Sequence, residues 1–280
     1  MIRTDAWQAQ TLEELQACLE ARPEVVALAS YGSTADPGRM DQWSDLDCLL
    51  VVVETAFEQY YPSIEWLKAF GEVYGYQQSN NAFHGTTRLC FSDFRRLDLI
   101  ITTPARFERL AEWPNNPFFQ RARLLFSRST MVSERLAQAW PQPQPICPTP
   151  VVFDEVINNF WFKAMLASYS IVRNQGLVAL YFALDLVRDG CYVAKLLLDR
   201  AEGTSVHHSG GFGNELVARL ASDAVDVSSA ASLLNLIEHS AIQFDQLAGE
   251  WSEAAGGRRY PFLEWLETIR RDIHRPDWPR

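Results

Sequence analysis

Two aspartates separated by one residue open an apolar segment of this chain. Asp45 and Asp47 flank Leu46, and the run Leu46–Val53 has the length and composition of a buried strand. Side chains two residues apart in a strand point to the same face, so both carboxylates are expected to project together. Adjacent carboxylates near a core repel each other and are costly unless a cation joins them. The spacing therefore indicates a divalent metal site, and Mg²⁺ prefers carboxylate and phosphate oxygens.

A glycine and a serine precede these carboxylates in the chain. The apolar run Val25–Tyr31 reads as another buried strand, and Gly32 and Ser33 follow it directly. Glycine permits close backbone approach. A short helix with Ser33 near its N-terminus would offer free N–H groups that suit a phosphate. We therefore expect Gly32 and Ser33 to cradle phosphates beside the metal. The alternative is an ordinary loop with two solvated aspartates.

This arrangement resembles the signature of the nucleotidyltransferase superfamily related to DNA polymerase beta. The chain has Gly32-Ser33, eleven residues, and then Asp45-Leu46-Asp47. The run 41–47, DQWSDLD, is especially similar to antibiotic nucleotidyltransferases. The resemblance implies a Mg²⁺-dependent enzyme that moves a nucleoside monophosphate, AMP from ATP, to a hydroxyl group and releases pyrophosphate.

A third carboxylate, Asp98, lies inside an otherwise apolar run. Thr86–Phe91 and Arg95–Thr102 are strand-like and predict a β-hairpin. Asp98 by itself fits the polar side of an edge strand, but the superfamily resemblance implies a carboxylate on a later strand. The hairpin is also similar to that of aminoglycoside 6-adenylyltransferases. If two Mg²⁺ ions bind, we expect Asp45 and Asp47 to hold the nucleotide-bound ion. Asp47 and Asp98 would hold the ion at the attacking hydroxyl. Asp98 is also a candidate for the general base.

Sequence patterns predict further elements around this site. Thr11 and Glu14 have the spacing of a capping box, which predicts a helix from Thr11 to about Ala21. Arg95 and Arg96 are interpreted as residues that flank the hairpin. Further helices are expected at residues 62–70, 105–112 and 133–139, and an edge strand is expected at residues 124–127.

Five prolines among residues 140–150 separate two different patterns. Such a run cannot form helix or central sheet and predicts a semi-rigid connector. We expect an α+β protein, with a nucleotidyltransferase domain of mixed sheet and helices (1–140), a linker (141–150) and an all-helical substrate-binding domain (151–280). Helices in the last part are expected at residues 152–173, 177–202, 212–222, 228–251 and 261–274.

The helical part carries a looser resemblance, to the C-terminal domain of streptomycin and lincosamide nucleotidyltransferases. Phe160, Trp161 and Arg173 carry it. Those families often have Arg-x-Glu where this chain has Gln175, and an amide does not take a proton at neutral pH. That departure leaves the substrate class and the choice of base open. Arg173 and Lys195 are candidates for contact with the triphosphate, although such side chains are usually solvated.

The composition is that of an ordinary globular chain with an acidic balance. The 280 residues are 48% apolar and 21% charged, with a formal net charge of −10. This charge argues against a nucleic-acid surface and is compatible with a cationic small substrate, although solubility also favours negative charge. No apolar run approaches a membrane span. Residues 1–10 show no secretory signal and the cysteines are scattered, so we expect a cytoplasmic protein without membrane partners.

Two classes of function remain open on this basis. By resemblance, the first is transfer of AMP to an aminoglycoside hydroxyl, with a lincosamide as the alternative acceptor. The second is a non-catalytic nucleotide-binding or toxin–antitoxin-type regulatory module, although a complete set of three carboxylates argues for catalysis. A protein or tRNA acceptor is a further possibility, and the lack of a basic stripe counts against tRNA. The sequence leaves open the acceptor, the nucleoside triphosphate that is used, and the oligomeric state, which is a monomer or a homodimer.

Overall fold

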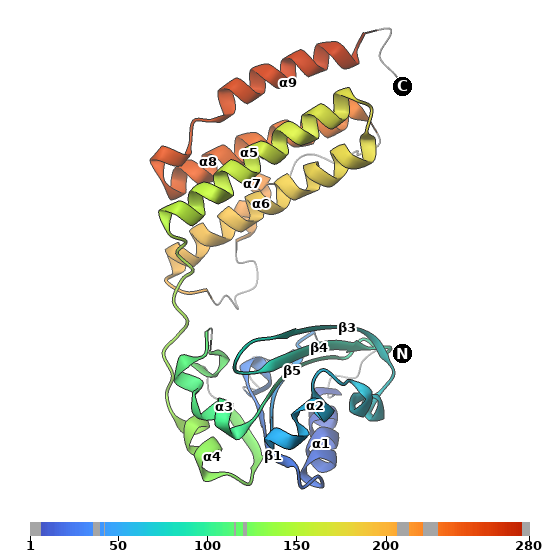
Figure 1. Cartoon of the computed structure of the whole chain (residues 1–280), viewed down its shortest axis with the longest axis vertical. Coiled ribbons are helices and arrows are strands. Elements are labelled where there is room, and N and C mark those ends of the chain that lie inside the picture. The colour runs from blue at the N-terminus through green and yellow to red at the C-terminus, as the bar shows by residue number, and fades with distance from the viewer. Residues whose placement is uncertain are drawn as a thin grey trace. The chain divides into compact units, whose positions relative to one another are not determined.

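The computed structural model describes residues 7–35, 40–41, 43–114, 116–119, 122–205, 213–220 and 229–275. Contacts divide the chain into two compact units, Met1–Pro143 and Gln144–Arg280. The first holds a mixed sheet with helices and the second is helical, as Figure 1 shows. The expected α+β class is thus confirmed. Residues 141–149 lie in neither helix nor strand. The division between the two units, after Pro143, falls within the expected linker 141–150.

The first unit is built on a six-stranded sheet. Its strands are β1 (Val25–Ser30), β2 (Leu46–Val52), β3 (Val73–Asn80), β4 (Gly85–Phe91), β5 (Arg96–Thr102) and β6 (Arg123–Ser127). Their order across the sheet is β3-β4-β5-β2-β1-β6. Neighbouring strands are antiparallel except β2 and β5, which run parallel. The β2–β5 register places Asp47 opposite Asp98, so the two carboxylates lie side by side on one face.

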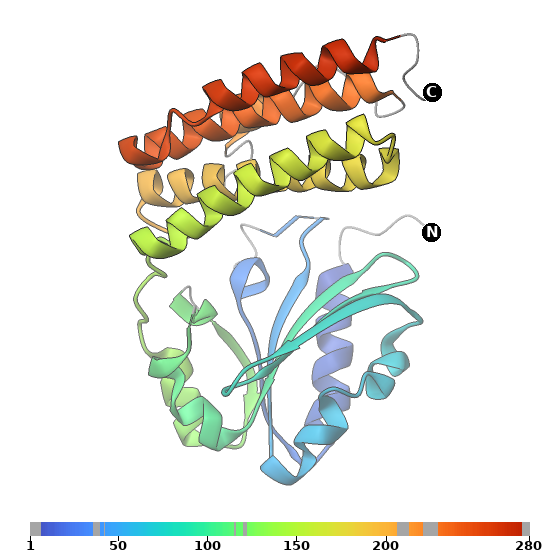
Figure 2. The same ribbon diagram turned by 45° about the horizontal axis from the view of Figure 1, so that its top comes forward.

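Both faces of the sheet are partly covered by apolar side chains from helices. The covering elements are α1 (Trp7–Glu20), α2 (Phe57–Tyr60), α3 (Pro104–Glu108), α4 (Thr130–Ala137) and the 3₁₀ segment η3 (Glu65–Phe70). Leu28 and Leu50 pack with α1, α2 and η3 on one side. Ala29 and Leu49, their neighbours in the strands, pack with α3 and α4 on the other. Figure 2 shows α1, in dark blue, running along the sheet. The central strands are therefore apolar on both faces, which explains their unbroken hydrophobic runs.

Helix α1 begins one turn earlier than the capping box predicts, so that prediction is wrong. Trp7 is 5% exposed and packs in the core, and this contact extends the helix towards the N-terminus. Thr11 is not the N-cap but a buried residue inside the helix. Gln8, also in the first turn, donates to the backbone oxygens of Asp41 (2.7 Å) and Ser44 (3.2 Å). The extra turn thereby holds the loop that leads into Asp45.

Strand β3 is absent from the sequence-based prediction, whereas the β4–β5 hairpin is confirmed. Most of β3 is exposed, Gly75 interrupts it, and it pairs only with β4 at the edge of the sheet. Backbone pairing rather than an apolar pattern thus holds it in place. The predicted helix over 62–70 is a 3₁₀ segment from Glu65 to Phe70, and the helix over 105–112 ends at Glu108 before a 3₁₀ turn.

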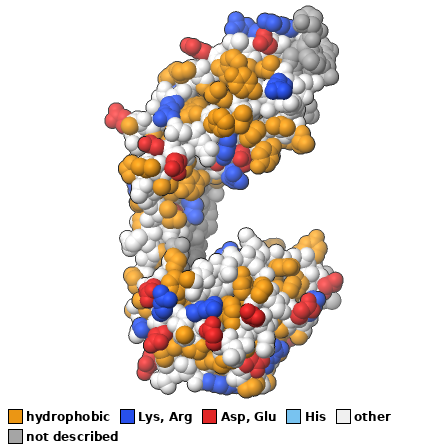
Figure 3. All heavy atoms as spheres, viewed as in Figure 1, with side chains coloured by type: hydrophobic (Ala, Val, Ile, Leu, Met, Phe, Trp, Pro, Cys, Tyr) orange, Lys and Arg blue, Asp and Glu red, His pale blue; other side chains and the backbone are white. Residues whose placement is uncertain are grey.

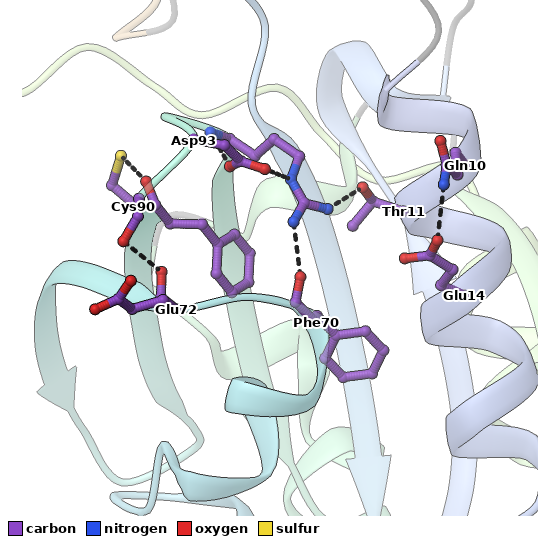
Figure 4. Close-up of polar contacts among 10 residues, drawn as sticks. Gln10, Thr11, Glu14, Phe70, Glu72, Cys90 and Asp93 are labelled. Atoms are coloured by element: carbon purple, nitrogen blue, oxygen red, sulfur yellow. Dashed lines mark hydrogen bonds and ion pairs between the residues drawn. The ribbon is translucent and has the colours of Figure 1, made fainter. Parts of the chain in front are cut away.

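Arg95 fastens the β4–β5 hairpin to the rest of the unit. Its guanidinium donates to the Asp93 carboxylate (2.7 Å), the Thr11 hydroxyl (2.9 Å) and the Phe70 carbonyl (2.7 Å). Figure 4 shows these three partners, which come from the hairpin turn, α1 and η3. The Arg95 side chain is 16% exposed and also lies over the Phe91 ring. One side chain therefore fixes the turn from which β5, with Asp98, starts.

The second unit is a bundle of helices with its own core. Its helices are α5 (Pro150–Val172), α6 (Gly176–Glu202), α7 (Asn214–Leu220), α8 (Ala230–Trp251) and α9 (Arg259–Ile273). In the core, the rings of Phe160 and Phe244 stack 3.6 Å apart. These helices agree with the predicted ones to within a few residues, except that residues 212, 221–222 and 228 of the predicted ranges lie outside the described residues.

Large apolar side chains also lie exposed on this unit, where Figure 3 shows orange groups among the charged ones. On α5 and α6 they include Phe162, Met165, Tyr169, Leu177, Tyr181 and Leu184. Among the described residues, no helix combines the length and the apolar character that a membrane span requires. The named side chains recur at a spacing of three or four residues, so each helix carries them along one face.

Candidate metal and nucleotide site

Three carboxylates meet at the end of the sheet. Asp45 comes directly before β2, Asp47 is its second residue, and Asp98 lies opposite Asp47 on β5. One carboxylate oxygen from each lies within 4.8 Å of the other two, and all three side chains are partly buried. The structure thus brings together the three carboxylates predicted as metal ligands. Their meeting follows from the strand geometry, because residues two apart share a face and the parallel partner is in register.

Gly32 and Thr34 shape the turn against these carboxylates. Gly32 has a φ of +60°, and a Cβ at this position would lie 2.4 Å from the Asp47 Oδ2 atom. Only glycine gives both the backbone conformation and the close approach. The Thr34 hydroxyl donates to the Asp45 carbonyl (3.2 Å) and accepts from the Asp47 N–H (3.0 Å). It therefore ties the 3₁₀ turn Gly32–Ala35 to the start of β2. This turn confirms the short helix predicted there.

Crowding and burial change the proton affinity of two of these groups. Burial, with the charges of Asp45 and Asp98, raises the pKa of Asp47 to about 7. Burial and the Asp45 charge likewise raise the pKa of Asp98. The neighbouring Tyr31 hydroxyl has its pKa raised by burial and by the Asp47 charge. The site therefore holds more negative charge than its surroundings compensate, which is the condition that a bound cation relieves.

Two arginines form ion pairs with the outer carboxylates. Arg96 Nη2 lies 2.7 Å from Asp45 Oδ2, and Arg88 Nε lies 3.0 Å from Asp98 Oδ2. No ion pair to Asp47 occurs among the described residues. The sequence predicts Arg96 only as a residue that flanks the hairpin and does not indicate a role for Arg88. The available signal was strand register, because Arg88 lies opposite Asp98 in the hairpin and Arg96 precedes Asp98 by two residues.

The residues present fit a hard divalent cation. All three potential ligands are carboxylate oxygens, which Mg²⁺ prefers, and two guanidinium charges do not balance three carboxylates. Asp45, Asp47 and Asp98 would hold the metal. The number of ions is not fixed by three side chains, because the substrate phosphates also supply ligands.

A comparison with protein families shows which group the chain belongs to. The family model for streptomycin adenylyltransferase matches residues 8–197. The chain belongs to this family. The match spans the turn at Gly32, all three carboxylates and the helices α5 and α6 as far as residue 197. The expected relationship to antibiotic nucleotidyltransferases is thereby confirmed, and the chain is a member of an adenylyltransferase family.

Solved structures similar to this family member are remote in sequence. An aminoglycoside 6-adenyltransferase from Bacillus subtilis is 14% identical, with a TM-score of 0.38, over 96% of this chain and 99% of that chain. A nucleotidyltransferase-like protein from Exiguobacterium sibiricum is 10% identical, with a TM-score of 0.28, over 94% of this chain and 90% of that chain. A comparison with curated proteins found no match.

The remaining predicted site residues of this adenylyltransferase family member lie in different places. Ser33 is partly exposed in the 3₁₀ turn beside Gly32. Arg173 and Gln175 are exposed in the turn between α5 and α6, and Lys195 is exposed on α6. These three belong to the helical unit, whereas the carboxylates belong to the sheet unit.

Within the helical unit, Arg173 and Lys195 lie far from each other. At the helical rise of 1.5 Å per residue, the length of α6 separates them by roughly 28 Å. A single triphosphate is too short to contact both, so at most one of them can bind it. The predicted contact of Arg173 or Lys195 with the triphosphate stays a prediction.

Proposed function

We propose that this chain is a Mg²⁺-dependent adenylyltransferase that moves AMP from ATP to a hydroxyl group of an aminoglycoside and releases pyrophosphate. The observation that carries the proposal is the meeting of Asp45, Asp47 and Asp98 within 4.8 Å in a member of the streptomycin adenylyltransferase family. An all-carboxylate cluster beside a glycine turn suits the phosphates of a nucleotide together with a metal ion.

The side chains divide the work of the transfer between them. Asp45 and Asp47 bind the nucleotide side of the site, and Asp47 and Asp98 the side of the attacking hydroxyl. Bound Mg²⁺, as one or two ions, would offset the charge that develops on the attacking and leaving oxygens. The hydroxyl oxygen attacks the α-phosphorus and pyrophosphate leaves. Asp98 takes the hydroxyl proton, provided that the hydroxyl lies within hydrogen-bond reach of its carboxylate.

The turn at Gly32 and Ser33 holds the β- and γ-phosphates in this proposal. The positive φ of Gly32 and the lack of a Cβ let the Asp47 carboxylate lie directly against this turn. The Thr34 hydroxyl holds the backbone of Asp45 and Asp47 and so keeps the two carboxylates in register with the turn. The triphosphate and these two carboxylates are thus positioned by one short segment.

The helical unit, residues 144–280, supplies the acceptor site in this proposal. The family match continues through α5 and most of α6, so the helices belong to the same functional unit as the carboxylates. The acidic chain, with a formal charge of −10, favours a cationic acceptor such as an aminoglycoside.

A lincosamide is the second candidate acceptor, and one observation favours it. Trp161, Tyr169 and Trp265 line a cavity of about 470 Å³ between α5 and α9. Aromatic walls suit an acceptor with an apolar part better than a fully charged one. Gln175, which replaces a glutamate often found in related families, also leaves the acceptor class open.

Pyrophosphate release tests the proposal. Each of four nucleoside triphosphates is incubated with Mg²⁺ and with a panel of aminoglycosides and lincosamides. Asp47→Ala and Asp98→Ala variants run in parallel, with circular dichroism as the check of folding. Release that requires one acceptor and is lost in the folded Asp47→Ala variant supports transfer and identifies the acceptor class. Release no greater than that of the variants, with nucleotide still bound, refutes transfer to these antibiotics and favours the non-catalytic nucleotide-binding module.

A further inference from the structure

The two arginines at the carboxylate cluster are more exposed than the groups with which they pair. The side chains of Arg88 and Arg96 are 57% and 52% exposed, whereas those of Asp98 and Asp45 are 16% and 24% exposed. Each arginine thus reaches inward to a carboxylate while much of its length stays in water. A side chain in this position can change partner without moving the backbone, because it has several rotatable bonds and lies at the open side of the site.

The strand register keeps both arginines beside the cluster whatever their partner is. Arg88 lies directly opposite Asp98 in the antiparallel β4–β5 pair. Arg96 precedes Asp98 by two residues on β5 and therefore points to the same face. Opposite and diagonal neighbours in a sheet stay within reach of long side chains. The positions of their Cα atoms are fixed by backbone pairing, and only the guanidinium groups are free to turn.

A metal ion and the arginines need the same oxygen atoms. Arg96 uses Asp45 Oδ2 and Arg88 uses Asp98 Oδ2, and both aspartates belong to the cluster that would hold a cation. In the metal-free protein, two guanidinium charges partly balance three carboxylates. When one divalent cation occupies the carboxylates, the three negative charges face four positive ones, so positive charge is in excess. The triphosphate then brings new negative charge to the same place.

Guanidinium groups are well suited to that second partner. Arginine presents five N–H donors in a planar fork that matches phosphate oxygens bidentately. In the contacts to the carboxylates, Arg88 uses its Nε and Arg96 a single Nη. Further N–H donors on both side chains are therefore left for another acceptor. In the proposed reaction, the phosphate oxygens of the nucleotide supply such acceptors beside the carboxylates.

We propose that Arg88 and Arg96 hold the carboxylate cluster together in the metal-free protein and turn to the phosphates of the nucleoside triphosphate when Mg²⁺ occupies the carboxylates. The inference rests on the proposed function, because it needs both a metal and a triphosphate at this site. It assigns two nucleotide-binding residues, both of them on the hairpin that carries Asp98 and neither on the glycine turn.

Two binding measurements without turnover test this exchange of partners. Arg96→Gln and Arg88→Gln are compared with wild type for Mn²⁺ alone, followed by electron paramagnetic resonance, and for a non-hydrolysable ATP analogue with Mg²⁺, followed by calorimetry. Loss of the competing guanidinium should tighten Mn²⁺ binding about two- to five-fold, the size of an exposed ion pair. Loss of a charge-assisted bond to phosphate should weaken binding of the analogue by about ten-fold or more.

Control variants separate this exchange from a general loss of structure or charge. Arg109→Gln removes the same charge from an exposed pair with Glu112 in the same unit and should leave both affinities unchanged. Arg96→Lys keeps the charge but loses the fork, so Mn²⁺ binding should stay near wild type while binding of the analogue weakens. A residue with a merely structural role would weaken both.

The outcomes distinguish this inference from the proposed function. Weaker Mn²⁺ binding or unchanged analogue binding in folded Arg96→Gln and Arg88→Gln overturns the inference while wild type still binds both ligands. A wild-type chain that binds neither Mn²⁺ nor the analogue overturns the proposed function, and the inference with it.

Discussion

Asp47 is the carboxylate whose surroundings change its chemistry most clearly. It lies under the Gly32 backbone and beside the other two carboxylates, and burial is the main reason that its pKa is raised to about 7. In the proposed transfer, Asp47 acts with Asp45 on the nucleotide side and with Asp98 on the side of the attacking hydroxyl. A change at this residue should therefore affect stability and catalysis in opposite directions.

In the metal-free protein, we expect stability to fall as the pH rises through about 7. The Asp47 pKa is about 7 in the folded chain and 3.8 in its ordinary state. The folded state therefore binds the proton more tightly, and this stabilisation is complete below the unfolded pKa and lost as the pH rises through the folded one. Thermal unfolding with a chelator, at about pH 5 and about pH 8, measures the loss. Asp47→Asn should reduce the difference between the two pH values, and an equally large difference in the variant would contradict the prediction.

Gly32→Ala should disable the site while leaving the fold largely intact. The added Cβ would lie 2.4 Å from Asp47 Oδ2, and the φ of +60° is unfavourable for alanine. We expect a loss of roughly 1–3 kcal/mol in stability and, from a displacement on the order of 1 Å, about 100-fold in turnover.

Gly75→Ala is the matched control for this substitution. A Cβ at Gly75 meets no atom within 4 Å, so this variant should behave as wild type. Equal turnover of the two variants would show that the close approach of Gly32 to Asp47 does not matter.

At the scale of elements, the parts of the site that depend on apolar runs are the parts that the sequence predicts. β1, β2 and the β4–β5 hairpin are recognisable because their apolar side chains are buried, and the spacing of Asp45 and Asp47 then determines a shared face. β3 has no such pattern, since it is an exposed edge strand held by backbone pairing.

The ion pairs of the site were beyond a sequence-based prediction for a related reason. The pairing of Arg88 with Asp98 depends on the register across a hairpin, and a shift by one residue would send Arg88 to the other face. The early start of α1 likewise depends on a tertiary contact, the burial of Trp7, rather than on a local capping signal. Local patterns thus locate the carboxylates but not the groups that surround them.

Arg95 should contribute more to stability than its place in a turn suggests. Its guanidinium joins Asp93, Thr11 and the Phe70 carbonyl, so Arg95→Ala breaks contacts with three different segments. We expect a loss of about 2–4 kcal/mol in the free energy of unfolding, measured with urea. Arg109→Ala breaks an exposed pair and should cost less than about 1 kcal/mol. Similar losses for the two variants would mean that Arg95 does not fasten the hairpin.

On the scale of the whole molecule, the chain consists of two units with separate cores. The sheet unit buries apolar side chains on both faces of the sheet, and the helical unit buries its own around Phe160 and Phe244. All three carboxylates and both paired arginines lie in the first unit. Metal binding should therefore be a property of the sheet unit, whereas the proposed transfer to an acceptor should require both units.

We expect residues 1–143 and 144–280, expressed separately, to fold as independent domains. Cooperative thermal unfolding of each fragment is the measurement, because each has its own hydrophobic core. The first fragment should bind Mn²⁺ within about three-fold of the full chain, an energy difference below 1 kcal/mol, and should catalyse no transfer. A first fragment that folds but does not bind Mn²⁺ would place part of the metal site in the helical unit.

The most direct measurement follows the α-phosphorus of ATP. The full chain is incubated with Mg²⁺, an aminoglycoside such as streptomycin, and ATP labelled at either the α- or the γ-phosphorus, and the antibiotic is then separated and analysed. The proposed reaction predicts that the α-label enters the antibiotic, that the γ-label leaves as pyrophosphate, and that Asp47→Asn abolishes the transfer while the fold is retained. Entry of the γ-label instead, or undiminished α-label transfer by Asp47→Asn, would contradict AMP transfer at the three carboxylates.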